Sequence, residues 1–515
     1  MKLNKFILIS IFLLFFLLYS FSFNQFQNKI FYSPDENINM HMSTIYSNSG
    51  KFYYKESLNN NLDNKIVHPR GIIPRGEKLV SILPIGGQML WGTLMMFGMN
   101  HLISFFVPLA SILTLLFLFL LLNKLFNKKI AYFSCLIVAI MAPFWFFSSS
   151  IMVSDILFLF FATTATFFLF KSKLQENNSI FLSSFFFSMS LLINYRAIFF
   201  LFSFLISFVF YFGKNIFKNK GVKKLLIILF GALIVLATLL FLNYILYGNP
   251  FSTGYSAIEK YSQEIEGPKF SLFYLEIPKL FFNLSNYLFY IPLYMAILTF
   301  GIFSFVLNKK NTMKKTFLFS FILYFAIATL YLSNIASAGT DTFSIQSSFF
   351  RYILPIFLLG GPFIYASLKN IKKYNKLLFV FLFVLINVGI IVASNGGITY
   401  YKNYETNSLN YINLVINNTE KDSVIVTSYY DKVLFPKRNV ADITLITEKG
   451  SLVGKEIDEK VVADTIVKIS KPVYILNRGG INLNCLREEL NLKGFEIIEI
   501  KNVPHLYKIL AKNEN

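Results

Sequence analysis

The sequence contains few charged residues and almost no cysteine. Only 15% of its 515 residues are charged, whereas 55% are apolar and the mean hydropathy is +0.56. These values exclude a chain that folds around one soluble core, and they indicate helices buried in lipid. The two cysteines, Cys135 and Cys485, lie in segments of very different character, so we expect neither a disulfide framework nor a cysteine metal site.

The charge that is present is mostly basic. With 48 lysines and arginines against 27 acidic residues, the formal net charge is +21, a value also found in nucleic-acid-binding proteins. Most of the lysines, however, stand in short clusters between apolar runs, where membrane topology places them. We therefore expect membrane lipids, and no nucleic acid, among the partners of the chain.

Eleven apolar runs predict membrane spans. The first, residues 6–23, follows Lys2 and Lys5 as a signal peptide would, but it lacks a convincing cleavage site and is interpreted as an uncleaved span. The other ten runs are also of spanning length. They occupy residues 101–122, 130–147, 155–170, 179–194, 197–212, 224–247, 286–307, 316–335, 350–368 and 377–394.

Residues 79–98 are ambiguous, because a proline, two glycines and a glutamine interrupt this apolar stretch at 84–88. If the stretch does not span, the five lysine clusters between the later runs lie on the same side as the basic N-terminus. Cytoplasmic loops are then lysine-rich throughout, whereas a spanning segment would move all five clusters outside. We predict eleven spans, a cytoplasmic N-terminus and an interfacial or re-entrant helix near 79–98 within a first external loop of residues 24–100.

The sequence changes character after residue 394. Short β-rich runs, "SVIVTS", "PVYIL" and "FEIIEI", alternate with two segments of helical periodicity, "EKVVADTIVKI" and "NCLREELNL". This region contains no glycine-rich phosphate loop and no His/Cys metal cluster. We predict two domains, a transmembrane domain of residues 1–394 and a small external soluble α/β domain of residues 395–515.

The first external loop contains two adjacent carboxylates in the stretch "SPDENINMH". Ser33 and Pro34 are typical of a helix start, and Glu36 would complete a capping box, so a purely structural role for Glu36 is an open alternative. Gly50 would end this helix. Asp35 is not needed for the cap, and the helix N-terminus favours a negative charge there. Asp35 is therefore a candidate base that accepts a proton from a hydroxyl or orients it.

Further ionisable residues are predicted at the outer ends of the spans. Asp155 stands where a loop enters a long apolar run, and such a carboxylate is costly unless it is useful, although a helix-cap role is the alternative. Arg196 and Arg351 are lone cations at helix ends, which snorkelling toward lipid headgroups also explains. Together with four basic residues of the first loop, they would offer bidentate donors to an anionic group such as phosphate. Those four are His68, Arg70, Arg75 and Lys78.

One or two carboxylates with several separated cations suit a reaction between a lipid phosphate donor and a hydroxyl acceptor. Phosphate is already a good leaving group, so a sugar leaves it without a protonated acid, and one carboxylate suffices to activate the hydroxyl. The cations would hold the phosphate and offset the charge that grows on it. Glycoside hydrolases differ, because they generally need an acid and a second carboxylate.

At these residues the chain resembles the GT-C glycosyltransferases that use polyprenyl-phosphate sugars, especially the aminoarabinose transferases and the protein O-mannosyltransferases. The matching features are the Asp-Glu pair in "SPDENINMHMSTIYSNSGKFYY", the aspartate at position 155, and the later motifs "NYRA", "LYGNPFSTGY" and "RYILP". The resemblance covers roughly residues 1–394. It implies a GT-C-like fold with Asp35 as the catalytic base, Glu36 beside it and Asp155 as a second carboxylate of the site. It also implies phosphate contacts for Arg196, Arg351 and Lys78.

The chain departs from this family in two places. The usual Lys-Pro-Pro stretch before the interfacial segment is replaced by "HPRGIIPRGEK", which leaves open whether Arg70, Arg75 or Lys78 takes the phosphate. The WWDYG-type motif of the oligosaccharyltransferases, which bind a divalent metal, is missing. We therefore expect no obligatory metal and no other cofactor.

Two functions of different classes follow. The first is an inverting glycosyltransferase that moves one sugar, a hexose or a pentose, from a polyprenyl or dolichyl phosphate to a hydroxyl of a protein, lipid or glycan at the outer membrane face. The second is a multi-span transporter or lipid flippase. A transporter should carry polar or broken helices at mid-membrane, whereas these mid-span residues are overwhelmingly Phe, Leu and Ile. The sequence therefore favours the enzyme, with the sugar and the acceptor left open.

Overall fold

The structure is a computed structural model that divides into two compact units. Unit 1 comprises residues 1–24, 101–239 and 270–401, and unit 2 comprises residues 25–100, 240–269 and 402–515. Most of the predicted span 286–307 and most of the predicted loops 248–285 and 336–349 lie outside the described residues. The described residues are 5–23, 31, 33–62, 65–172, 176–218, 221–254, 256, 297–300, 302–303, 312–334, 348–369, 372–394, 397–427, 430–435, 437–442, 458–477 and 481–512.

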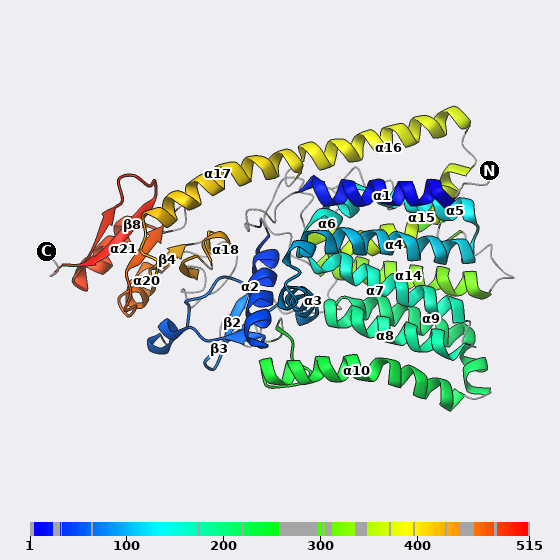
Figure 1. The fold of residues 1–515 in the computed structure, drawn as a ribbon, viewed down its shortest axis with the longest axis horizontal. Coiled ribbons are helices and arrows are strands. Elements are labelled where there is room, and N and C mark those ends of the chain that lie inside the picture. The colour runs from blue at the N-terminus through cyan, green and yellow to red at the C-terminus, as the bar shows by residue number, and fades with distance from the viewer. Residues whose placement is uncertain are drawn as a thin grey trace. The chain divides into compact units, whose positions relative to one another are not determined.

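Unit 1 is built from long apolar helices, several of which run side by side (Figure 1). Ten of the eleven predicted spans coincide with helices, as expected for a backbone that has to satisfy its own hydrogen bonds in lipid. The last part of α10 belongs to unit 2. The helices are α1 (Lys5–Ser22), α4 (Ile103–Leu125), α5 (Lys128–Ile140), α6 (Ala142–Ser149), α7 (Ser154–Ser172), α8 (Asn177–Ile193), α9 (Ala197–Lys218), α10 (Gly221–Tyr247), α14 (Thr312–Asn334), α15 (Ser348–Lys369) and α16 (Lys373–Ala393).

The helices show that the chain is a multi-pass membrane protein. Among the residues that the structure describes, four helices are long and apolar enough to cross a membrane, and the bent pair α5 and α6 makes a fifth. The number of eleven spans stays a prediction.

The predicted span 130–147 is a broken helix. The axes of α5 and α6 meet at an angle of 66°. Pro143 stands in the first turn of α6, where it has no N–H to continue the hydrogen bonds of α5. The N–H of Ala142, freed at the break, donates to Oδ1 of Asn387 on α16 at 2.8 Å. A buried asparagine therefore satisfies the backbone at the bend.

Small residues bring the helices of unit 1 close together. A methyl group added at Gly361 on α15 would lie 2.6 Å from Cβ of Ser134 on α5, so only glycine fits this approach. The hydroxyl of Ser183 on α8 donates to the carbonyl of Ala165 on α7 at 2.9 Å. Both contacts are typical of helices that pack in lipid, where small residues allow close approach and hydroxyls bond across the interface.

The ambiguous stretch 79–98 does not form a spanning helix. It begins in the strand β3 (Lys78–Ser81) and continues in the helix α3 (Ile85–Met96), which has 12 residues. Such a helix is about 18 Å long, against about 30 Å for the hydrocarbon core of a bilayer. The assignment of the lysine clusters to the side of the N-terminus requires that residues 79–98 do not span, and α3 meets that requirement.

Unit 2 contains two sheets. A small antiparallel sheet has the order β1-β3-β2, with β1 at Tyr53–Tyr54 and β2 at Ile72–Arg75. The larger sheet has the order β5-β4-β6-β8-β7, in which β5, β4 and β6 are parallel and β8 runs antiparallel to its two neighbours. Its strands are β4 (Val424–Thr427), β5 (Asn439–Asp442), β6 (Val473–Leu476), β7 (Phe495–Glu499) and β8 (Leu506–Ala511).

The predicted α/β character of the C-terminal region is confirmed. The three predicted strand runs contain β4, β6 and β7. The first predicted helical run contains α20 (Glu459–Ile466), and the second covers α21 (Leu483–Leu492) except for its first residue. The prediction missed the helix α17 (Ile398–Asn417), the short helix α18 (Asp431–Leu434) and the strands β5 and β8. Of the missed helices, α17 is largely polar and α18 has only four residues, which leaves little pattern to read.

Residues of the first loop complete the hydrophobic core of the C-terminal sheet. Leu62, Ile66 and Val67 belong to the same buried cluster as Val424 and Ile475 of that sheet. Val67 also forms a bridge with Ala441 of β5. The C-terminal sheet and the first loop therefore form one unit, although more than 350 residues separate them along the chain.

Candidate active site

The two adjacent carboxylates lie at the start of α2 (Pro34–Ser49) in unit 2. The predicted helix is confirmed, with Ser33 as an extended N-cap and with Gly50 ending the helix in the left-handed conformation at a φ of 68°. The predicted capping box is wrong in one respect, because the Ser33 hydroxyl makes no cap hydrogen bond. Nδ2 of Asn37 instead donates to the carbonyls of Phe31 and Ser33, at 2.9 and 3.1 Å. These bonds fix the chain as it enters the helix.

The two carboxylates differ in exposure. Glu36 is 2% exposed, whereas Asp35 is half-buried and keeps contact with solvent. Consecutive helix residues point about 100° apart, so one of the two can be buried while the other stays accessible. A substrate therefore reaches Asp35 more readily than Glu36.

Gln88 of α3 connects α3 to the middle of α2. Its side chain, which is fully buried, donates through Nε2 to Asn39 at 3.3 Å and to the Ser81 hydroxyl at 2.9 Å. The backbone carbonyl of Gln88 accepts from the Ser43 hydroxyl of α2 at 3.1 Å. Sequence reasoning treated Gln88 only as an interruption of an apolar run. A lone amide in such a run was the available signal, because a buried amide needs partners.

Three predicted site residues meet in unit 1. Asp155, in the first turn of α7, is 3% exposed, and Nη2 of Arg196 donates to its Oδ1. Nε of Arg351, in the first turn of α15, lies 3.9 Å from its Oδ2. Asn194 accepts from Nε of Arg196 at 3.0 Å and so orients that guanidinium. The structure therefore brings together residues that are up to 196 positions apart in the sequence.

In this cluster two guanidiniums share one carboxylate. Both contacts to Asp155 lie at the ends of apolar helices. Both arginine side chains remain 19% exposed, whereas the Asp155 side chain is only 4% exposed. The guanidiniums are thus the groups of this cluster that a ligand can touch. Fork-shaped guanidiniums bind the oxygens of phosphate or carboxylate with two bonds each.

Arg75 and Lys78 lie on the hairpin of β2 and β3 in unit 2. Nη2 of Arg75 donates to the carbonyl of Tyr247 in the last turn of α10, where the helix dipole favours a cation. The Tyr247 hydroxyl donates in turn to the carbonyl of Ser81 at 2.7 Å. The ammonium of Lys78 lies 4.6 Å from the ring centre of Tyr53. Their predicted roles as phosphate contacts stay predictions.

The motif "LYGNPFSTGY" packs on this hairpin. Gly248 turns the chain after α10 with a φ of 75°. A methyl group on Gly254 would lie 2.3 Å from the carbonyl oxygen of Ile82. The two glycines of the motif therefore serve a turn and a close backbone contact, which other residues cannot make without strain.

The structure gives Arg70 and His68 internal partners. Nη2 of Arg70 donates to Oδ1 of Asp431 at 2.6 Å, and the backbone N–H of Arg70 donates to Oδ2 at 2.8 Å. His68 is 1% exposed, and burial lowers its pKa, which favours the neutral ring. A neutral buried imidazole and a guanidinium that already holds a carboxylate are poor phosphate ligands, so we leave both out of the proposed phosphate site.

His41 of α2 predicts an acid sensitivity of folding. Its ring packs against those of Tyr54 and Phe435, with centroid distances of 5.0 and 4.3 Å. Burial lowers its pKa to about 4, from about 6.5 in an unfolded chain. Between these values the unfolded chain binds a proton that the folded chain does not. The free energy of unfolding should therefore fall as the pH falls through this window, by up to about 3 kcal/mol.

The replacement His41→Phe should remove part of this sensitivity. The drop in Tm of the detergent-solubilised protein between pH 7.5 and pH 4.5 is expected to be several degrees smaller than in the wild type. His101→Phe, at an exposed position, is the control and should leave the drop unchanged. Equal drops in wild type and His41→Phe would contradict a neutral buried His41.

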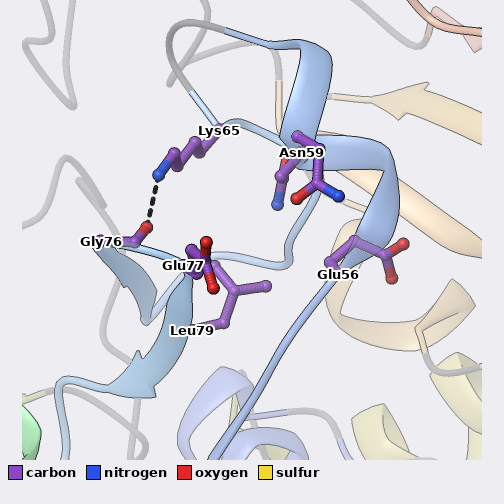
Figure 2. Close-up of a pocket in the computed structure, with 7 residues that line it drawn as sticks. Glu56, Asn59, Lys65, Gly76, Glu77 and Leu79 are labelled. Carbon is purple, nitrogen blue, oxygen red and sulfur yellow. Dashed lines mark hydrogen bonds between the residues drawn. The ribbon is translucent and has the colours of Figure 1, made fainter.

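Figure 2 shows a small hollow in unit 2. None of the predicted site residues is among the residues that line it. Nζ of Lys65 donates to the carbonyl of Gly76 at its rim, at 2.5 Å. Glu77 is paired with Lys55 at 2.5 Å. The hollow therefore presents mainly polar groups that bind each other. Within the described part of the chain, no group of three or more His, Cys, Asp or Glu residues could hold a metal ion.

The fold and the motifs can be compared with known proteins. Residues 84–241 match the family described as dolichyl-phosphate-mannose-protein mannosyltransferase. The fold matches ArnT from Cupriavidus metallidurans bound to undecaprenyl phosphate, with a TM-score of 0.59 and 10% identity over 99% of this chain and 98% of that one. The chain has the GT-C fold. The resemblance inferred from the sequence is thereby confirmed.

A second solved structure shares the GT-C fold over part of its length. It is the oligosaccharyltransferase of Archaeoglobus fulgidus tethered to an acceptor peptide with the NVT sequon, with a TM-score of 0.53 and 11% identity. The match covers 92% of this chain and 69% of that one. No curated protein matches the chain by sequence. At such identities the GT-C likeness is one of fold, so the function is argued from the residues of the site.

Proposed function

We propose that the chain is an inverting glycosyltransferase that moves a single sugar from a polyprenyl-phosphate donor to a hydroxyl of a protein, lipid or glycan. The observation that carries the proposal is the cluster of Arg196 and Arg351 on Asp155 in a GT-C fold. The descriptions of ArnT and of the matched family both name a phosphate on a long isoprenoid lipid, which supports the same donor class here.

The two guanidiniums of the arginine cluster suit such a donor. A sugar linked to a lipid phosphate is a phosphodiester with one negative charge, and guanidiniums bind the oxygens of such a group. When the sugar leaves, the phosphate becomes a monoester and approaches two negative charges. Arg196 and Arg351 therefore stabilise the leaving phosphate more than the bound donor, and only that difference accelerates the reaction.

Asp35 is proposed as the base of the reaction. The acceptor oxygen forms a bond to the anomeric carbon as the bond from that carbon to the phosphate oxygen breaks. The proton of the hydroxyl passes to the Asp35 carboxylate, and the lipid phosphate leaves with the bonding electrons. Attack on the face opposite the phosphate inverts the anomeric centre. No step needs an acid or a metal ion, so transfer in the presence of a chelator is expected.

The transporter or flippase alternative is not favoured. The fold matches over nearly the whole chain are to glycosyltransferases. Asp155 and Arg351 also stand in the first turns of α7 and α15, and Arg196 directly precedes α9, so none of the three lies in the middle of a span. Direct observation of bond cleavage separates the two functions.

The test of the proposal is sugar transfer in membranes from cells that express the chain. A panel of labelled polyprenyl-phosphate sugars is supplied, and both labelled product and released polyprenyl phosphate are measured. A glycosyltransferase should form the two in equal amounts. Movement of intact donor across the membrane without cleavage would contradict the proposal.

The proposed orientation places the C-terminal α/β domain outside the cell. Cys485 is exposed and Cys135 is buried, so one cysteine reports on this domain. In intact cells, a membrane-impermeant maleimide should label the wild type and should not label Cys485→Ser. Labelling of Cys485 only after permeabilisation would contradict the orientation.

A further inference from the structure

The helix α18 of the C-terminal domain binds the first loop through a buried ion pair. The Asp431 side chain is fully buried and holds Arg70 through the backbone N–H, Nε and Nη2. An aspartate that accepts several bonds from one arginine imposes both position and orientation on it. The pair joins α18 to the segment that leads into β2.

The same helix α18 is followed by a residue that touches α2. Phe435 packs against the ring of His41 on α2, at 4.3 Å between centroids. It also packs on a buried cluster that includes Ile38 and Met42, both on the helix that begins with Pro34 and Asp35. The segment from Asp431 to Phe435 therefore contacts the helix of the proposed base directly.

A third contact joins the first loop to the C-terminal sheet through the backbone. Val67 and His68 form bridges with Ala441 of β5, and Val67 is buried in the core of the C-terminal sheet. The ion pair, the aromatic contact and the strand bridge all lie within unit 2. Three independent contacts thus tie the C-terminal sheet to the loop that carries Asp35.

We propose that the C-terminal domain positions the helix α2, with Asp431 and Phe435 as positioning residues for the sugar-transfer step. The part of the C-terminal domain in sugar transfer rests on the proposed function of Asp35, whereas the effect of this domain on α2 does not. Holding one residue of the long first loop in place costs conformational entropy. Docking on the folded C-terminal sheet orders the loop before the substrate binds, so this cost does not add to the barrier of the reaction. Both residues would act through α2 and not on the substrate itself.

The first measurement is hydrogen exchange of the amides of α2 in the full chain. Asp431→Asn keeps the side-chain shape but removes the charge that holds Arg70, and it should raise the exchange rates of α2 by about tenfold or more. Asp422→Asn is the matched control. It breaks an exposed ion pair with Lys471 on the same domain and should leave α2 unchanged.

A reversible cross-link then separates positioning from folding. Cysteines at Val67 and Ala441, in a chain with Cys485→Ser, stand at bridged strand positions and should form a disulfide on oxidation. In the Asp431→Asn background the oxidised cross-link should restore slow exchange of α2, and reduction should abolish the rescue. If Asp431→Asn does not fold, Phe435→Ala provides the same comparison with the ion pair intact.

Transfer kinetics provide the functional test. Loss of positioning should lower kcat by about 10- to 100-fold while KM changes by less than about threefold, and the cross-link should recover kcat. Unchanged exchange of α2 in both variants, or failure of the cross-link to form, would overturn the proposal. If exchange of α2 became faster and the rate of transfer did not change, the positioning of α2 by the C-terminal domain would stand. The proposed role of Asp35 as the base would then be wrong.

Discussion

Replacing Asp35 by asparagine is expected to lower sugar transfer by about 10²- to 10⁴-fold, because the variant loses the group that takes the proton from the acceptor hydroxyl. Asparagine has nearly the same shape and tolerates the first turn of a helix, so α2 should remain folded. Donor binding should survive, since the base acts on the acceptor. Initial rates with labelled donor, together with donor binding measured separately, check both expectations.

The control for Asp35→Asn is Asp422→Asn, which removes an equally charged but exposed carboxylate from the same unit. The control should transfer sugar at the wild-type rate. Equal transfer by wild type and Asp35→Asn would reduce Asp35 to a residue of the helix start. Loss of donor binding in Asp35→Asn would show that the change acts on the structure and not on proton transfer.

The second large loss of activity is expected when either arginine that contacts Asp155 is replaced. Arg196→Gln and Arg351→Gln are each expected to lower kcat/KM by about 10²-fold, because each removes a donor from the phosphate on which charge develops. The loss should be mainly in kcat, since the charge on phosphate grows during the reaction. Steady-state kinetics over a range of donor concentrations distinguish this result from a pure loss of binding.

The double variant and a distant lysine complete this experiment. Arg196 and Arg351 share the carboxylate of Asp155, so the double variant should lose less than the product of the single losses. Lys171→Gln removes a cation from the last turn of the same helix α7 and should transfer sugar normally. Wild-type kinetics in both single variants would leave these arginines with a role in helix packing alone.

The helices of unit 1 could be predicted because lipid makes one demand of every residue in a span. A backbone without water has to bond internally, so long apolar runs become helices, and ten of the eleven predicted runs coincide with them. The bend between α5 and α6 was not predicted. It depends on Pro143 together with Asn387, an amide 245 residues away that accepts from the freed N–H of Ala142.

The site was predicted only as a set of residue types. Local pattern placed Asp35 at the start of a helix, and Asp155, Arg196 and Arg351 at helix ends. It did not show that the last three would meet, and it also offered Arg70 and His68 among the candidates for phosphate. Those two have neighbours from the C-terminal domain, which no local signal could indicate.

The sequence by itself determined the class of protein, the helices and the motifs of the GT-C fold, because hydropathy and short spacing act locally. Only the tertiary structure decided which charges meet. Arg70 and Asp431 lie 361 residues apart, and an ion pair between distant side chains depends on how whole elements pack. For the same physical reason, two cations of similar appearance in the sequence, Arg70 and Arg196, have different partners and different proposed roles.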